Sequence, residues 1–257
     1  MQHRSTQMRF EPKEALPLSF SGLKQFAKSP AHFVHYKTAP YSSSAAMRRG
    51  TLVHRMILEP QKMHRMHIID ASTRANKSFK EAEAEHGEYA CLQKEFDEAE
   101  AIAAAVNRHS YANNTIWLAD QREEHMHWEC EGLQFHGFPD AYGNGVLLDL
   151  KVTNPEPKKF QRMVMDQAYH MQLAMYRMAM KQPVECFWVV VDPSPPYTCA
   201  VYKPSNDMLE DGVKMARLEA RMYLNWMENW DNRAKVLGYD HYDQGQPMTL
   251  ELPSWHR

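Results

Sequence analysis

The sequence of 257 residues has few cysteines and no long apolar run. Its four cysteines are scattered and form no Cys-x-x-Cys pair, which argues against a zinc ribbon, an iron–sulfur cluster or a disulfide framework. No apolar stretch approaches the roughly 20 residues that span a bilayer. The N-terminus is polar and lacks the apolar segment of a signal peptide. We therefore expect a cytoplasmic location.

The sequence also lacks a marked excess of charge and a nucleotide-binding loop. Thirty basic and 32 acidic residues give a net charge of −2. Proteins that coat nucleic acids usually carry a basic excess, so the balance argues mildly against that class. It says little about an enzyme that holds DNA in a local basic groove. No Gly-x-x-x-x-Gly-Lys-Ser/Thr motif is present, which argues against a helicase motor.

Apolar periodicity predicts an α/β protein. The length fits a single domain over residues 1–257, with residues 1–16 as a flexible arm and residues 238–257 as a C-terminal tail. Helices are expected at 19–28, from 30 onward, and at 42–58, 78–108, 166–181 and 208–230. Strands are expected at 123–128, 133–142, 146–153, 186–192 and 197–203.

The segment from 137 to 153 carries the strongest chemical signal. Asn144-Gly145 predicts a two-residue hairpin turn, because type I′ turns need positive φ at both central positions. A hairpin built on that turn brings Asp140 opposite Asp149, with Cβ atoms about 4.5–5.5 Å apart. Two carboxylates this close repel each other unless a cation lies between them or one is protonated.

The second strand of this hairpin places an acid and a lysine on one face. Side chains alternate, so Leu147, Asp149 and Lys151 point together while the even-numbered residues enter an apolar layer. Magnesium is commonly held by one or two carboxylates and substrate phosphate, and it can activate a water molecule for hydrolysis. Lys151 would position or deprotonate that water, or stabilise the transition state. A surface hairpin with a cross-strand Asp–Lys pair is the alternative, because the motif is short.

Further motifs surround this hairpin in the sequence. They are a helix at 23–33, a Gly-x-x-x-His helix at 50–60, a strand with a glutamate at 124–128, and a Gln-x-x-x-Tyr helix at 169–176. Tyr169, Gln172 and Tyr176 are three and four residues apart and therefore share a helix face. Together with Pro139-Asp140 and the Asp149-x-Lys151 pair, these stretches resemble the PD-(D/E)xK nuclease superfamily. The most similar type is RecE (exonuclease VIII), a phage recombination exonuclease resembling lambda exonuclease.

The resemblance implies a fold and a set of site residues. The fold would be a restriction-endonuclease-like core, a central mixed β-sheet flanked by helices, with added N-terminal helices. One or two Mg²⁺ ions, with Mn²⁺ as a substitute, would be held by four groups: His54, Asp140, Asp149 and the backbone carbonyl of Leu150. The catalytic set would be Lys151, Asp140, Asp149, Glu124, Gln172 and Tyr176. Glu123 is an alternative to Glu124 in a different strand register.

The resemblance also implies a function and partners. The chain would be a double-stranded DNA exonuclease, digesting 5′ to 3′ and leaving 3′ overhangs for a single-strand annealing protein. It would form a homo-oligomeric ring of three or four copies in a bacterial host cell, encoded by phage or host. Arg48, Arg49, Lys158 and Lys159 are candidate phosphate contacts, with plain solubility charges as the alternative. An endonuclease of repair or restriction and an inactive DNA-end-binding protein remain open.

Overall fold

The structure, a computed structural model, describes residues 10–230. These residues form two compact units, each described here by itself. Unit 1 comprises residues 10–40, 129–135 and 216–230, and unit 2 comprises Tyr41–Trp128 and His136–Met215. The predicted tail at 238–257 and the first nine residues of the predicted arm lie outside the described residues. No helix in the described part of the chain is long and apolar enough to cross a membrane.

Unit 1 contains short helices around an aromatic core. The elements are η1 (Pro12–Ala15), α1 (Phe20–Lys28), α2 (Pro30–Thr38) and the C-terminal part of α9 (Asn206–Glu228). Ser19 and Ser29 cap α1 and α2, because their side chains accept hydrogen bonds from backbone N–H groups in the first turns of these helices. The fully buried Tyr223 packs its ring against Phe33, with centroids 5.2 Å apart.

Part of the predicted flexible arm is ordered. The second half of residues 1–16 contains η1, and Pro12 within it is buried. The Tyr223 hydroxyl donates a 2.9 Å hydrogen bond to the Pro12 carbonyl. A buried tyrosine hydroxyl needs such a partner, and this bond ties η1 to α9 within unit 1.

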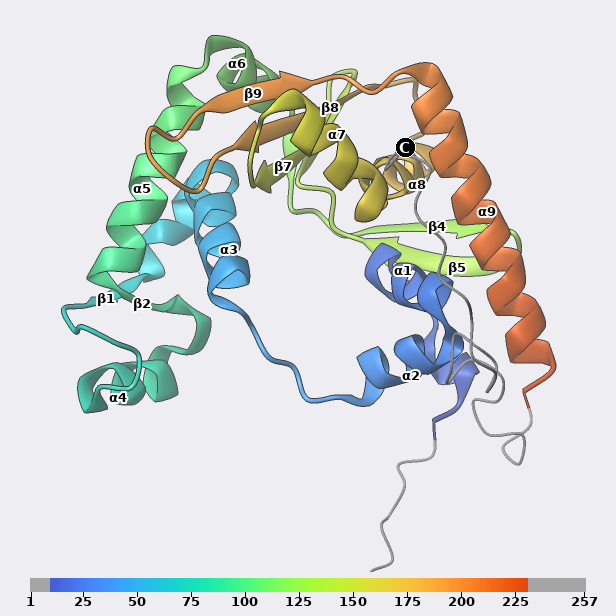
Figure 1. The fold of residues 1–257 in the computed structure, drawn as a ribbon, viewed down its shortest axis with the longest axis horizontal. Coiled ribbons are helices and arrows are strands. Elements are labelled where there is room, and N and C mark those ends of the chain that lie inside the picture. The colour runs from blue at the N-terminus through green and yellow to red at the C-terminus, as the bar shows by residue number, and fades with distance from the viewer. Residues whose placement is uncertain (1–9, 231–257) are drawn as a thin grey trace, which may run out of the picture. The chain divides into compact units, whose positions relative to one another are not determined.

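Unit 2 contains a five-stranded mixed sheet, as expected (Figure 1). Its strand order is β3 (Gln121–Arg122), β6 (Ala141–Gly143), β7 (Val146–Val152), β8 (Glu185–Val191) and β9 (Cys199–Tyr202). Strands β7 and β8 are parallel, and the other neighbouring pairs are antiparallel. β7 lies in the middle of this order.

Helices cover both faces of this sheet. Three helices pack on the face that carries Leu148, Leu150 and Val189: α3 (Ala45–Leu58), α5 (Gln93–Arg108) and α6 (Ser110–Leu118). The opposite face is covered by α7 (Pro157–Asp166) and α8 (Tyr169–Ala179). There the Phe160 ring of α7 lies 5.9 Å from Trp188 of β8. Because β7 is covered on both sides, its side chains are largely removed from water.

The predicted helix at 78–108 is interrupted. Helix α4 (Lys77–His86) ends at Gly87, whose φ of 57° is easily adopted only by glycine. A short helix η3 (Gly87–Tyr89) and strand β2 (Ala90–Leu92) follow before α5 begins. β2 pairs in parallel with β1 (His67–Ile69), which follows η2 (Pro60–Arg65). The apolar Ala90–Leu92 segment is therefore a strand and not a helix turn.

The predicted strand at 133–142 is two strands. β5 (Leu133–Gly137) pairs with β4 (Met126–Cys130), whereas β6 belongs to the five-stranded sheet. Pro139 separates them, because proline has no N–H to donate to a strand ladder. Helix α7 was not predicted. It begins at Pro157, and the Glu156 carboxylate caps it by accepting from the N–H groups of Lys158 and Lys159.

Gly212 of α9 offers a test of close packing in unit 2. A Cβ at this position would lie 2.5 Å from the His170 carbonyl oxygen of α8. Gly→Ala in a helix usually stabilises by about 0.5–1 kcal/mol. We expect Gly212→Ala instead to destabilise by roughly 1–3 kcal/mol through this overpacking. Gly50→Ala in α3, where nothing lies within 4 Å, should be neutral or stabilising. Urea denaturation followed by circular dichroism would measure both, and equal midpoints would contradict the expectation.

Candidate active site

The predicted hairpin forms with the predicted register. Tyr142 pairs with Leu147 and Gly143 with Val146, around a turn in which Asn144 and Gly145 have φ of 47° and 84°. The last paired residues are Ala141 and Leu148. The next residues along, Asp140 and Asp149, therefore lie where the ladder ends.

Side chains replace the partner strand beyond that point. One edge of β7 is paired with β8 along the whole length of β7. On the other edge, the pairing between β6 and β7 stops at Leu148. The Leu150 N–H donates instead to Asp140 Oδ2 at 2.5 Å. The Leu150 carbonyl contacts His54 Nε2 of α3 at 2.9 Å. Because no strand pairs with β7 here, the backbone groups of Leu150 bind and orient one carboxylate, that of Asp140, and one imidazole, that of His54.

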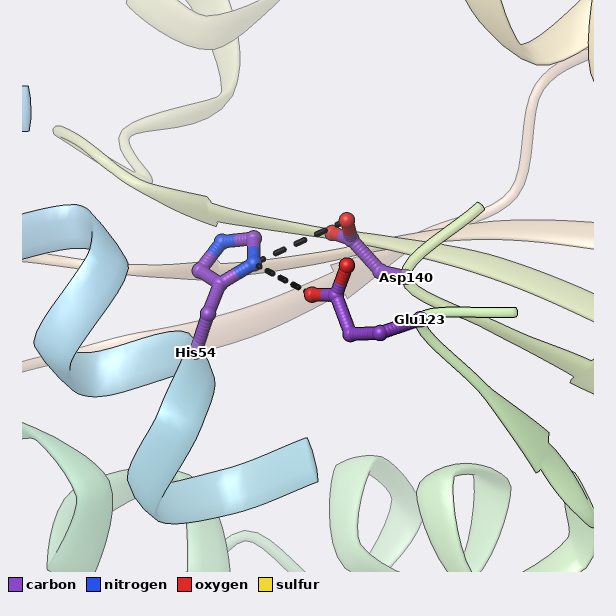
Figure 2. Close-up of side chains that lie close together, drawn as sticks. All are labelled: His54, Glu123 and Asp140. Carbon is purple, nitrogen blue, oxygen red and sulfur yellow. Dashed lines mark ion pairs between the residues drawn. The ribbon is translucent and has the colours of Figure 1, made fainter. Parts of the chain in front are cut away.

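His54, Glu123 and Asp140 form a group that could hold a metal ion (Figure 2). One potential ligand atom from each lies within 4.8 Å of the others. His54 Nδ1 lies 3.6 Å from Glu123 Oε1 and 3.6 Å from Asp140 Oδ1. Because Nε2 must donate to the Leu150 carbonyl, a neutral His54 turns the lone pair of Nδ1 toward both carboxylates.

Asp149 and Lys151 form a second, buried part of the site. The Asp149 side chain is 3% exposed, and Lys151 Nζ lies 2.9 Å from its Oδ1. Lys151 also donates to Gln172 Oε1 at 3.1 Å and lies 4.3 Å from the centre of the Tyr169 ring. Asp149 Oδ2 is buried and accepts no hydrogen bond, although Nζ is 2.8 Å away. The ammonium of Lys151 is therefore the charged partner of both Asp149 oxygens.

The protonation equilibria show an excess of negative charge. Burial raises the pKa of Asp149 to about 6, and Asp140 adds to this while Lys151 opposes it. Burial also raises the pKa of Asp140, against the charges of His54 and Lys151. Burial lowers the pKa of His54, but Asp140 and Glu123 outweigh it and raise the value to about 9. Three carboxylates thus face two bases in a partly dry space.

Lys151 remains protonated in this environment. Burial lowers its pKa, but the charges of Asp149 and Asp140 and the hydrogen bond to Asp149 outweigh burial and raise it above its ordinary value. An ammonium group with a raised pKa is a donor and a positive charge at neutral pH, and it is a poor general base.

Helix α8 supports Lys151 on the face of the sheet that carries this lysine. Gln172 contacts Lys151, and Tyr176 lies beside Gln172, which lowers the pKa of the Tyr176 hydroxyl against the effect of burial. Burial raises the pKa of Tyr176 to about 12, so its hydroxyl stays protonated. A Cβ on Gly137 would lie 2.6 Å from the Tyr176 ring, so the chain leading to Asp140 passes directly against this tyrosine. Tyr176 therefore acts on Lys151 through Gln172.

Glu124 is not part of the group, and Glu123 takes its place. Glu123 has a φ of 51° and donates its backbone N–H to the Asp140 carbonyl at 3.1 Å. This left-handed residue ends β3, and its own side chain joins His54 and Asp140, whereas the motif resemblance favoured Glu124. Glu124 is exposed and lines an open depression with Asp120 and Arg122. The choice between the two registers is corrected accordingly.

The four candidate phosphate contacts differ in their surroundings. Arg48 donates to the Ser43 carbonyl at 2.7 Å, and Arg49 lies 3.6 Å from Glu98. Both arginines line a cavity together with glutamates. Lys158 and Lys159 are exposed in the first turn of α7, the helix that follows β7 in the chain. A role in DNA contact remains a prediction for all four.

Comparison with known proteins identifies a family and a similar fold. Residues 19–233 match the family described as "PDDEXK-like domain of unknown function (DUF3799)". The crystal structure of a "Putative exonuclease" from Eubacterium rectale superposes with a TM-score of 0.62 at 18% identity, over 89% of this chain and 87% of that one. At this identity the likeness concerns the fold. No curated protein matches the chain in sequence.

The two neighbouring glutamates give a matched test of the metal group. Glu123→Gln removes a charge from the group with His54 and Asp140, so we expect divalent-cation affinity to fall about tenfold or more. Glu124→Gln removes the same charge outside the group and should leave affinity nearly unchanged. Isothermal titration calorimetry with Mn²⁺ would measure both. A larger loss for Glu124→Gln would contradict this assignment.

Cation affinity should also rise with pH. A cation held by His54, Glu123 and Asp140 needs a neutral His54, whose pKa is about 9, and an ionised Asp149 beside them, whose pKa is about 6, strengthens its binding. Between pH 6 and pH 9 the His54 proton competes with the cation, and below pH 6 the Asp149 proton opposes binding as well, so affinity should rise up to about pH 9. At neutral pH we expect about one proton released per ion from His54. Calorimetry in two buffers of different ionisation heat measures this release. A His54→Gln variant should lose it, and equal heats in both buffers for the unaltered chain would contradict the linkage.

Proposed function

This chain belongs to the PDDEXK-like domain family, and we propose on that basis that it is a magnesium-dependent deoxyribonuclease acting at ends of double-stranded DNA. One observation carries the proposal. Asp140 binds the Leu150 N–H at the open edge of β7, and the buried Asp149, whose pKa Asp140 raises further, pairs with Lys151 beside it. This arrangement suits phosphodiester hydrolysis, in which an anionic nucleophile attacks an anionic phosphate. The carboxylates can hold a cation, and Lys151 adds a second positive charge.

The donor set fits a hard divalent cation. Asp140, Glu123 and His54 Nδ1 would hold it, with Asp149 beside them. Carboxylate oxygens suit Mg²⁺, and the single imidazole nitrogen also permits Mn²⁺. When bound, the ion would supply an activated water and a positive charge for the phosphate. The Leu150 carbonyl, expected as a ligand, accepts from His54 and so orients the imidazole.

Lys151 would donate to a phosphate oxygen or to the attacking water. Its raised pKa keeps the ammonium charged, which favours charge stabilisation over proton abstraction. Asp149 and Gln172 hold Nζ on two sides, so little side-chain freedom is lost when substrate binds. Tyr176 holds Gln172 and is a positioning residue.

The finer features of the proposal rest on the motif resemblance to RecE-type exonucleases. They are 5′ to 3′ polarity, 3′ overhangs passed to a single-strand annealing protein, and a ring of three or four copies. A ring would also suit a net charge of −2, because basic patches from several copies, such as Lys158 and Lys159, would line one channel. The host compartment would be the bacterial cytoplasm, with the gene carried by phage or host.

Digestion of linear duplex DNA tests the function. We expect the chain to release nucleotides from a 5′-phosphorylated, end-labelled duplex with Mg²⁺ and to stop with EDTA. Lys151→Ala should lower the rate at least about 100-fold by removing charge stabilisation. Lys203→Ala removes an exposed lysine that pairs with Glu185, and as the matched control it should keep the rate.

Other outcomes separate the alternatives. Cutting of closed circular duplex would favour an endonuclease. Binding of DNA ends without hydrolysis, by folded protein, would leave an end-binding protein and overturn the catalytic proposal. Light scattering on the same preparation gives the number of copies, and a monomer that still digests DNA would remove the ring.

A further inference from the structure

Three histidines gather on the exposed face of the β4–β5 pair. In a two-stranded sheet alternate side chains share a face, and here Trp128 and Phe135 are buried, whereas His127 of β4 and His125, directly before β4, are exposed. His136 of β5 joins them from the opposite strand. All three histidines belong to unit 2, and none belongs to the acidic group around Asp140.

Two of the imidazoles already have the spacing of metal ligands. His125 Nε2 and His136 Nδ1 are 3.1 Å apart, with ring centroids separated by 5.3 Å and planes at 89°. In a tetrahedral zinc site with Zn–N bonds of about 2.0–2.1 Å, two ligand nitrogens lie about 3.3 Å apart. The ring nitrogens of His125 and His136 therefore need to separate by only a few tenths of an ångström to hold one ion.

The third imidazole, His127, lies beside this pair. Its ring centroid is 4.2 Å from that of His125 and 6.3 Å from that of His136. A rotation of the exposed His127 side chain toward the pair would complete a set of three nitrogen ligands. Phe138 stacks on His125 with centroids 4.5 Å apart and planes within 9°, which fixes the orientation of the His125 ring.

We propose that His125, His127 and His136 form a second metal site, selective for a borderline divalent ion of the Zn²⁺ class. Imidazole nitrogens suit Zn²⁺, Ni²⁺ and Cu²⁺, whereas Mg²⁺ takes oxygen ligands. Three nitrogens leave a fourth position for water. The two metal sites therefore differ in the hardness of their donors, and excess Mg²⁺ does not compete at the histidines.

The three histidines lie close in sequence to the acidic group, so a metal ion bound by them would affect the chain segments that lead to it. His125 follows Glu123 by two residues, and Phe138 precedes Asp140 by two. An ion held across β4 and β5 would brace both chain segments that lead into the acidic group. It would thus stabilise the entry to the site without taking part in the chemistry.

Cobalt spectroscopy with the full chain tests the site. Four-coordinate Co²⁺ absorbs visible light far more strongly than six-coordinate Co²⁺, so the histidine site has a signature that an octahedral acidic site lacks. In excess Mg²⁺ we expect one equivalent of Co²⁺ to give this absorption and one equivalent of Zn²⁺ to displace it. His136→Ala should weaken binding about tenfold or more by removing a ligand.

Two further variants identify where the ion binds. Asp140→Asn disables the acidic group and should leave the cobalt absorption intact. His64→Ala is the matched control and should also leave it intact, because His64 is exposed elsewhere and makes its own 2.7 Å hydrogen bond to the Gln61 carbonyl.

The proposal is overturned if the unaltered chain shows no tetrahedral Co²⁺ spectrum. It is equally overturned if Asp140→Asn abolishes the spectrum while a folded His136→Ala chain keeps it. In either case His125 and His136 would be no more than a hydrogen-bonded pair. Neither result bears on DNA hydrolysis, which is measured separately.

Discussion

The open edge of β7 beyond Leu148 is the constraint on which the site depends. A central strand must satisfy its backbone groups on both edges, yet β6 ends before Leu150 is reached. The Leu150 N–H and carbonyl are satisfied by Asp140 and His54 instead. The need to satisfy one backbone N–H and one backbone carbonyl thereby holds the Asp140 carboxylate and the His54 imidazole in place. Loss of either side chain would leave a backbone group of β7 without its present partner.

The two faces of the sheet contribute different parts of the site. Helix α3 packs on the apolar face that contains Leu150 and delivers His54 to the strand edge. Helix α8 packs on the other face, where Gln172 contacts Lys151. Because side chains alternate along β7, Asp149 and Lys151 belong to the α8 side while the intervening Leu150 anchors the α3 side. Three consecutive residues thus join both helical layers at one point.

Turn type and strand alternation were sufficient to predict the hairpin from the sequence, but not the elements around it. The Asn144-Gly145 turn fixes the register, so the convergence of Asp140, Asp149 and Lys151 could be derived from spacing alone. The preference for Glu124 rested on the motif resemblance and is wrong, because the left-handed residue Glu123 ends β3 and places its own carboxylate in the group. Nothing in the sequence marks Glu123 as left-handed. The predicted strand at 133–142 ran through Pro139, a signal that was present and should have divided it. The helix α7 was missed because its Pro157 start follows the strand within a few residues.

Charge explains why a divalent cation suits this arrangement better than the protons that it would replace. When Glu123, Asp140 and Asp149 are ionised, protonated His54 and Lys151 leave the group with one net negative charge. A phosphodiester carries a further negative charge and would be repelled in a partly dry site, where such interactions are stronger than in water. Exchange of the His54 proton for a divalent ion brings the group to neutrality. His54, whose raised pKa reflects the same carboxylates, is therefore the residue at which metal binding and substrate approach are linked.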